Sequence, residues 1–237
     1  METQAPENGK YVHRVIPNGL LELTFYLGKR PNVLDPSRSF NDNSLLTGQQ
    51  QEFFDLEITS ENSMFSVSIK PHGAMILFNI PVSELTNQNV SLRHLISGQT
   101  SRLEDSLALA ESFQDRVTVM ETFLMNQIKR QYNAFELSRI VNSIFLVNGS
   151  KGLIKIDDLA SKACLSRKQY ERSFRKHIGT SPKQFLKTVR FQNALHKRQI
   201  GSKIDLGELA FLCGYYDQAH MTKDFKILSG LTPKQFF

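Results

Sequence analysis

The sequence has few of the features that mark secreted or metal-stabilised proteins. It holds only two cysteines, Cys164 and Cys213, which are too few for a disulfide framework. No cysteines and histidines have zinc-finger spacing, and His13, His72 and His94 show no metal-ligand pattern. We therefore expect no metal, no cofactor and a reducing cytoplasm as the setting.

Long hydrophobic runs are also missing. The longest apolar stretches, such as residues 74–78, are far shorter than the roughly 20 residues that span a bilayer. The first ten residues are polar and hold no apolar signal-peptide segment. The sequence predicts a cytoplasmic protein with no membrane partner.

Motifs of the common enzyme classes are absent. The sequence contains no GxSxG, P-loop, HExxH or dinucleotide fingerprint. We therefore predict that the protein is not an enzyme and has no catalytic residues.

Charge is divided unequally along the chain. Residues 1–135 hold 11 Lys and Arg against 15 Asp and Glu, a net charge of −4. Residues 136–237 hold 18 against 8, a net charge of +10. This asymmetry favours a second half that faces a polyanion, although a solvated basic surface gives the same count.

The first half reads as β-rich. Apolar and polar residues alternate within 21–27, 52–58 and 64–70, which is the period of half-buried strands. Turn signals separate these segments, as at Pro17-Asn18-Gly19 and Pro71-His72-Gly73. After Pro81 the pattern predicts helices near 82–97, 101–113 and 115–129.

The second half reads as all-helical. Near its start, five apolar residues are predicted to form one helical face: Phe135, Ile140, Ile144, Phe145 and Val147. The predicted fold class is α+β, with a β-rich domain over 1–130 and an all-α domain over 131–237. We place the boundary within residues 129–133.

An internal repeat organises the second half. Residues 174–185, FRKHIGTSPKQF, match residues 225–236, FKILSGLTPKQF, at an offset of 51. Upstream, Leu159-Ala160 matches Leu209-Ala210 at an offset of 50. Such self-similarity marks one supersecondary unit used twice.

Each copy is predicted to be a helix-turn-helix. In the first, Asp157 or Asp158 is expected to cap the opening helix, and Ser166 to cap a second helix that Gly179 ends. In the second copy, Asp205 and Asp217 are the expected N-caps. Gly214 is expected to form the turn, and Gly230 is expected to end the second helix. The two cores are predicted from Leu159, Ala160, Leu165, Tyr170 and Phe174, and from Leu209, Ala210, Cys213, Tyr215, Met221 and Phe225.

A helical solenoid is the alternative interpretation of this repeat. Solenoids need at least about three copies, and this chain has two. The second helix of the first copy also carries an unusually basic outer side: Arg167, Lys168, Arg172, Arg175 and Lys176. Both observations favour a helix that enters the major groove of DNA.

Residues 133–237 resemble the DNA-binding domain of AraC/XylS-family transcription regulators. The match rests on Leu209-Ala210-x-x-Cys213-Gly214-Tyr215, then Phe225-Lys226, then Gly230-Leu231-Thr232-Pro233-Lys234-Gln235-Phe236. The resemblance implies seven helices, with a rigid helix over about 182–198 joining two helix-turn-helix units. One departure is Cys164, where the family usually has glycine at the first turn, so we expect strain or a left-handed backbone there.

The resemblance also implies base-facing positions in double-stranded DNA. In the first unit they are Arg167, Lys168, Glu171 and Arg172, with Arg175 nearby, and in the second unit Gln218, Ala219, Thr222 and Lys223. Arg172 is suited to guanine and Gln218 to adenine, whereas Lys168 and Lys223 are suited to phosphate alone. Glu171 either accepts from cytosine or pairs with a neighbouring cation. We expect the basic first helix-turn-helix to contribute most of the affinity for DNA.

The first half resembles, more weakly, a β-rich N-terminal domain of uncharacterised function found in some AraC-type proteins. The stretch runs from Val67-x-Ile69-Lys70-Pro71 through Pro81-x-x-Glu84-Leu85. It implies a sensing or oligomerisation domain, with a small-molecule effector and a homodimer as candidate partners. Its aromatic residues are interpreted as core, with a small apolar pocket as the alternative.

Three functions are weighed. The first is a sequence-specific DNA-binding transcription regulator, an activator, with RNA polymerase as a further candidate partner. The second is an interaction protein that keeps the fold but acts through protein contacts or dimerisation. The third, a DNA-repair alkyl acceptor with AraC-like units, needs a reactive cysteine outside the helix-turn-helix core, and the sequence has none there.

Overall fold

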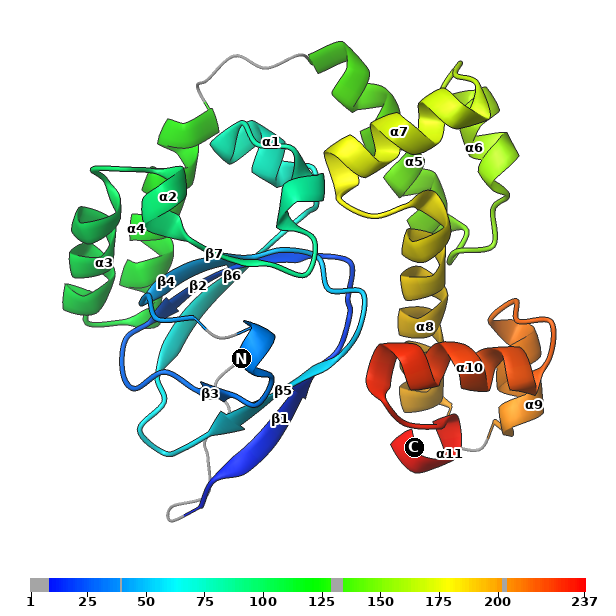
Figure 1. Ribbon diagram of the computed structural model, residues 1–237, viewed down its shortest axis with the longest axis horizontal. Coiled ribbons are helices and arrows are strands. Elements are labelled where there is room, and N and C mark those ends of the chain that lie inside the picture. The colour runs from blue at the N-terminus through cyan, green and yellow to red at the C-terminus, as the bar shows by residue number, and fades with distance from the viewer. Residues whose placement is uncertain (1–8, 39, 129–133, 202–203) are drawn as a thin grey trace. The chain divides into compact units, whose positions relative to one another are not determined.

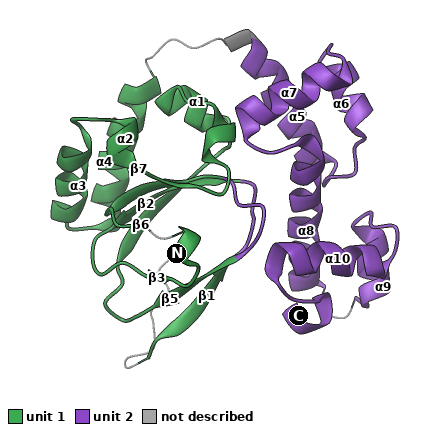
Figure 2. Cartoon of the chain, in the orientation of Figure 1, with its two compact units in different colours: residues 1–15, 20–48, 54–132 green, residues 16–19, 49–53, 133–237 purple. Residues whose placement is uncertain are grey.

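The computed structural model describes residues 9–38, 40–128, 134–201 and 204–237. The chain divides into two compact units, which Figure 2 draws in different colours. Unit 1 holds residues 1–15, 20–48 and 54–132, and unit 2 holds residues 16–19, 49–53 and 133–237. The predicted boundary, within 129–133, lies outside the described residues.

Unit 1 is built on two antiparallel sheets. Its strands in the described residues, labelled in Figure 1, are β1 Tyr11–Val15, β2 Leu21–Tyr26, β3 Asn32–Val33, β4 Ser44–Thr47, β5 Phe54–Ile58, β6 Met64–Ile69 and β7 Asn89–Ser91. One sheet has the order β1-β5-β3 and the other the order β6-β2-β4-β7. The strands predicted at 21–27, 52–58 and 64–70 are confirmed as β2, β5 and β6.

The core of unit 1 lies on one face of the four-stranded sheet. Leu21, Leu23 and Phe25 of the central strand β2 are buried there, because alternate strand residues point to the same face. Leu23 lies opposite Leu46 of β4, and Phe25 lies opposite Phe65 of β6. The helices that complete this core are α1 Gly73–Phe78, η2 Val82–Leu85, α2 Leu92–Leu95, α3 Thr100–Leu109 and α4 Phe113–Ile128.

The single helix predicted near 82–97 is wrong. The segment forms η2, then β7, then α2. Asn87 has a φ of 58°, a left-handed conformation that ends helical geometry. Val90 then pairs with Leu46, so β7 extends the sheet. The helices predicted at 101–113 and 115–129 are confirmed as α3 and α4, with shifted ends.

Unit 2 is all-helical outside its short N-terminal segments. The helices in its described residues are α5 Ala134–Gly149, α6 Ile156–Lys162, α7 Arg167–Ile178, α8 Pro182–Ile200, α9 Leu206–Leu212, α10 Gln218–Ser229 and α11 Pro233–Phe236. They make up the seven helices that the family resemblance implied. No helix in the described ranges is long and apolar enough to cross a membrane.

The predicted apolar face of α5 needs one correction. Ile140, Ile144 and Val147 are buried, as their i, i+4, i+7 spacing requires. Phe145, in contrast, is 75% exposed. It follows Ile144 directly and is therefore rotated about 100° away from the buried stripe.

Candidate nucleic-acid interface

The first helix-turn-helix consists of α6 and α7. Ser166 caps α7 with a capping box: its hydroxyl accepts from the Gln169 N–H at 3.4 Å, and the Gln169 side chain accepts from the Ser166 N–H at 3.1 Å. Gly179 ends the helix at a φ of 95°. Both predicted ends of this recognition helix are confirmed.

The predicted acidic cap of α6 is wrong. Lys155 occupies the N-cap position and makes no side-chain cap. Asp157 and Asp158 lie within the first turn, where their charges still favour the positive end of the helix dipole.

The turn between α6 and α7 contains the left-handed residue that the sequence suggested. Cys164 has a φ of 52° and is exposed, and its N–H donates to the Ser161 carbonyl at 2.9 Å. Leu165 N–H then donates to the Ala160 carbonyl at 3.0 Å, which closes the turn. Cys164 thus fills a glycine position at a conformational cost of about 1 kcal/mol.

The second helix-turn-helix consists of α9 and α10. Asp205 caps α9 by accepting from the N–H groups of Gly207 and Glu208 at 2.8 and 3.0 Å. Gly214 forms the turn at a φ of 72°, and Asp217 caps α10. Gly230 ends α10 in the left-handed conformation. Every predicted signal of this copy is confirmed.

The repeated sequence also gives the same local structure after each recognition helix. Ser181 caps α8 and Thr232 caps α11, each followed by proline at the first helical position. The repeated phenylalanines also pair in the same way. The ring centroids of Phe174 and Phe185 lie 5.7 Å apart, and those of Phe225 and Phe236 lie 6.0 Å apart.

Helix α8 joins the two helix-turn-helix copies within unit 2. Phe185 and Leu186, near its start, are buried in the core that holds Tyr170 and Phe174. Phe191, Ala194 and Leu195, further along, are buried in the core that holds Met221 and Phe225. The 19-residue helix is about 28 Å long and seats one helix-turn-helix on each half.

The predicted base-facing side chains lie mainly on the surfaces of the recognition helices. On α7, Arg167, Lys168, Glu171, Arg172 and Arg175 are all exposed. On α10, Gln218, Ala219 and Lys223 are exposed. Thr222 is half-buried, and its hydroxyl donates to the Gln218 carbonyl at 2.8 Å, so part of its hydrogen-bonding capacity is used within the helix.

Arg167 is held by two carboxylates. Its Nη1 lies 3.1 Å from Asp157 Oδ1, and its Nε lies 3.1 Å from Glu171 Oε1. The hydrogen bond that Arg167 donates to Glu171 is the main reason that the pKa of Arg167 is raised. Of the two roles left open for Glu171, the structure contains the pairing with a neighbouring cation. The contact to Asp157 was not foreseen, because the two residues lie on different helices.

Glu136 ties α5 to the back of the first recognition helix. Its carboxylate accepts from the Ser173 hydroxyl at 2.9 Å and from Lys176 Nζ at 3.2 Å. Burial opposes ionisation of Glu136, but these hydrogen bonds outweigh it and lower its pKa. Lys176 therefore serves this internal contact, whereas the remaining cations of α7 face outward.

A buried carboxylate holds the second recognition helix. Asp224 on α10 is 4% exposed, and its Oδ1 lies 3.6 Å from Nζ of Lys187 on α8. Its Oδ2 lies 3.9 Å from Nε2 of His220 and has no hydrogen-bond partner in the described part of the chain. Sequence reasoning missed this cluster, although a single Asp on the apolar side of α10 was a visible signal.

Two family models match the chain. A model of a helix-turn-helix domain matches residues 159–237, and a model of a domain of unknown function matches residues 1–91. The C-terminal part of the chain is an AraC-type helix-turn-helix domain. The resemblance that the sequence motifs indicated is thus confirmed for both parts of the chain.

Several bacterial proteins are similar to parts of this chain. An uncharacterised HTH-type transcriptional regulator of Haemophilus influenzae is 38% identical over 81 residues, which are 34% of this chain and 27% of that protein. The Msm operon regulatory protein of Streptococcus mutans is 21% identical over 159 residues, which are 65% of this chain and 55% of that protein. The matched region thus spans between about a quarter and about half of these relatives.

One solved structure is similar in fold to this chain. A crystal structure of ToxT from Vibrio cholerae is similar at a TM-score of 0.51 and 12% identity, covering 99% of this chain and 98% of that one. At this identity the likeness concerns the fold alone. It confirms the predicted α+β class, with a β-rich part followed by a helical part.

Proposed function

We propose that this protein is a sequence-specific DNA-binding transcription regulator that reads two adjacent major grooves. One observation carries the proposal: two capped recognition helices, α7 and α10, are each seated on one half of the continuous helix α8. Successive major grooves on one side of B-DNA are about 34 Å apart, which is close to the length of α8. The names of the relatives support a role in transcription.

The charges on the two recognition helices support unequal contributions. Five exposed cations lie on α7, namely Arg167, Lys168, Arg172, Arg175 and Lys176, and the last of these pairs with Glu136. The matching face of α10 presents Gln218, Ala219 and Lys223. We assign most of the electrostatic affinity to α7, with Arg172 as the candidate guanine reader, and register and base selection to α10 through Gln218.

The test is binding to DNA fragments selected by the purified protein from a random library. We expect a selected site that spans two helical turns, and affinity that falls steeply with salt. Arg172→Ala should weaken binding at least about tenfold and relax one base position, since a bidentate contact discriminates by 1–3 kcal/mol. Lys70→Ala, at an exposed lysine of unit 1, is the matched control and should leave binding unchanged.

An interaction protein is the second candidate, and exposed aromatic residues on the second helix-turn-helix favour it. Phe211 on α9 is 82% exposed and Tyr216 in the turn is 94% exposed. Such side chains are typical of protein contacts, and RNA polymerase is the partner expected for an activator. If Arg172→Ala and Lys223→Ala leave regulation intact while Phe211→Ala abolishes it, this candidate replaces the first.

A homodimer is a further proposal, through helices α3 and α4. Their exposed apolar residues include Leu109, Phe113 and Met125, at 81%, 64% and 62% exposure. Sedimentation over a hundredfold concentration range tests it, and a constant monomer mass would contradict it.

As a DNA-binding regulator the protein has no catalytic step, and we place it with the chromosome in the bacterial cytoplasm.

A further inference from the structure

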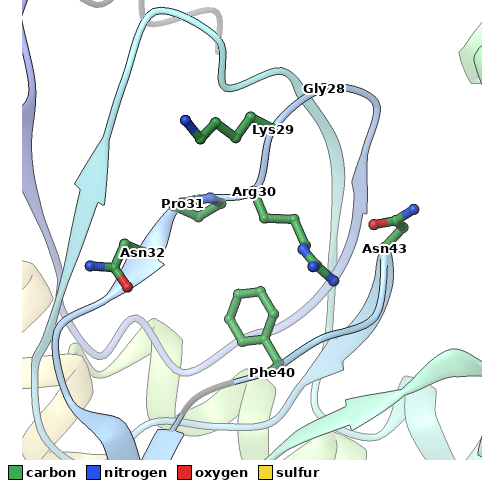
Figure 3. Close-up of a pocket in the computed structure, with 7 residues that line it drawn as sticks. All are labelled: Gly28, Lys29, Arg30, Pro31, Asn32, Phe40 and Asn43. Carbon is green, nitrogen blue, oxygen red and sulfur yellow. The ribbon is translucent and has the colours of Figure 1, made fainter.

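The loop between α5 and α6 lies against the middle of helix α8. A β-carbon on Gly152 would lie 2.7 Å from the carbonyl oxygen of Leu186 and 2.8 Å from Cγ of Arg190, so only glycine permits this approach. Gly28 has the same role in unit 1, where its loop passes close to the Glu61 backbone and lines the open pocket shown in Figure 3. The loop of unit 2 meets α8 where the buried segment for the first helix-turn-helix core ends and that for the second begins.

This α5–α6 loop has a defined and unfavourable backbone conformation. Lys151 and Gly152 have φ values of 55° and 79°, both in the left-handed region, which a lysine rarely adopts. The Gly152 N–H donates to the Val147 carbonyl at 2.9 Å, and the Leu153 N–H donates to the Ser150 carbonyl at 3.1 Å. A residue other than glycine keeps such a conformation only where its surroundings determine it. The loop therefore holds Leu153 in a defined place.

Leu153 packs on the turn of the second helix-turn-helix. Its Cδ2 lies only 1.9 Å from the place that a β-carbon on Gly214 would take, so this methyl group occupies the space that the glycine leaves open. The rest of the Leu153 side chain faces solvent, at 52% exposure. The loop that leads into the first helix-turn-helix thus contacts the turn of the second directly, and not only through α8.

Two further side chains connect the same elements. Arg190, which the loop approaches, has its guanidinium carbon 5.7 Å from the centre of the Tyr215 ring, a cation–π distance. Burial raises the pKa of the Cys213 thiol, and the positive charges of Lys197 and Lys151 oppose that rise. Lys151 therefore lies close enough to the second turn for its charge to act there.

We propose that Leu153 is a positioning residue that fixes the angle between the two helix-turn-helix copies. Helix α8 sets their separation and rotation, but a helix of this length can curve, which leaves the two recognition helices some freedom to rock. The contact between Leu153 and the Gly214 turn lies off the axis of α8 and therefore resists that motion. The proposal rests on the proposed function in one respect, because reading two grooves of DNA is what gives this angle its importance.

The first test measures distances within the full-length protein, without DNA, by pulsed electron spin resonance. One spin label is attached to the native Cys164, which is exposed, and the other to Lys226→Cys on α10, while Cys213 is buried and stays unlabelled. Labelled protein is diluted with unlabelled protein, so that only distances within one chain contribute. We expect a single narrow distance distribution in this reference protein. Leu153→Ala should broaden it beyond the spread of repeated reference measurements.

Two further variants separate positioning from loss of structure. Phe145→Ala is the matched control, because it removes a side chain of 75% exposure from the helix that precedes the loop, and it should leave the distribution unchanged. Leu153→Met keeps an apolar side chain of similar volume and should preserve the narrow distribution. The melting temperatures of all variants should stay within about 3 °C of the wild type, since neither side chain lies in a core.

The second test measures DNA binding on sites of different spacing. Leu153→Ala should bind the selected two-groove site about threefold to tenfold more weakly, because looser geometry lowers the effective concentration of the second contact. Inserting one base pair between the two contacted segments should cost the wild type more affinity than it costs Leu153→Ala. Both proteins should bind a fragment with one contacted segment equally well, which a variant that is merely unfolded would not do.

Three results would overturn the proposal. They are an unchanged distance distribution in Leu153→Ala, equal broadening in Phe145→Ala, and an equal spacing penalty in wild type and Leu153→Ala when both bind DNA. The first two are measured without DNA and do not depend on the proposed function. If the distribution broadens as expected but no DNA fragment binds, the positioning role of Leu153 stands and the proposed function fails.

Discussion

Lys187 on α8 and Asp224 on α10 form an ion pair across the interface of the linker helix and the second recognition helix, with Nζ 3.6 Å from Oδ1. The side chain of Asp224 is 5% exposed and that of Lys187 is 19% exposed. Because water screens such a pair poorly, the contact fixes α10 on α8 more firmly than a surface ion pair would.

Lys187→Met should therefore destabilise the second helix-turn-helix. It leaves the buried Asp224 carboxylate without its lysine partner, at a cost of about 1–3 kcal/mol. Urea unfolding measures this loss, and DNA affinity should fall with it. Lys183→Met, at an exposed lysine of the same helix, is the control. Equal effects of the two substitutions would show that the pair contributes nothing.

The two turn residues, Cys164 and Gly214, should respond oppositely to exchange. Cys164→Gly removes the left-handed strain but adds freedom to the unfolded chain, so we expect a net gain of up to about 1 kcal/mol. Gly214→Ala places a side chain at a φ of 72° and should cost about 1–2 kcal/mol. The nearby Leu153 side chain is exposed and can move aside, so the backbone sets the cost.

Thermal unfolding compares both variants with the wild type. A loss of stability in Cys164→Gly larger than about 0.5 kcal/mol would mean that the thiol makes a contact worth more than the strain. An unchanged Gly214→Ala would show that this turn tolerates a β-carbon.

Acid should weaken unit 1 through Asp55. Arg14 donates to both oxygens of Asp55, at 2.8 and 2.7 Å, and joins β1 to β5. This hydrogen-bonded pairing lowers the pKa of Asp55 in the folded state. The unfolded value is about 3.9, so the stabilisation is fully present above about pH 4 and is lost as pH falls through the lower folded value.

Asp55→Asn tests that linkage. At pH 7 the variant should lose about 1 kcal/mol, and its stability should decline less steeply than that of the wild type below about pH 4. Asp105→Asn, at an exposed carboxylate of α3, controls for removing one charge. Parallel acid profiles for wild type and Asp55→Asn would contradict the assignment.

Removing Asp157 should strengthen DNA binding. Its carboxylate holds Arg167 at 3.1 Å and adds negative charge beside the recognition helix. Asp157→Asn frees that guanidinium in part, and we expect affinity to rise roughly twofold to fivefold at low salt. Asp158→Asn removes the same charge from the next residue, which makes no such contact, and is the matched control. Equal gains in DNA affinity from both substitutions would show that the effect comes from net charge and not from the contact with Arg167.

Sequence reasoning succeeded where structure is decided locally. Ser166, Asp205 and Asp217 are caps because each side chain bonds to backbone a few residues away. The α9–α10 copy was predicted in full, since its stop and turn positions are glycines. The same logic failed at α6, where Lys155 occupies the N-cap position and the two aspartates lie in the first turn.

The rest depended on contacts distant in sequence. Asn87 ends a helical pattern because the chain there rejoins the sheet at Leu46, which no local signal reveals. Asp157 and Asp224 each pair with a residue on another helix, and the sequence alone does not show which helices pack against each other.

Helix α8 sets a phase as well as a length. Inserting one residue between Leu186 and Phe191 would rotate everything downstream by about 100° and detach one of the two cores from its half of the helix. An insertion of seven residues would nearly restore the rotation but add about 10 Å. Helix α8 therefore fixes both the separation and the relative rotation of the two recognition helices. Substitutions on those helices can change which bases are read far more easily than they can change the distance between the two sites.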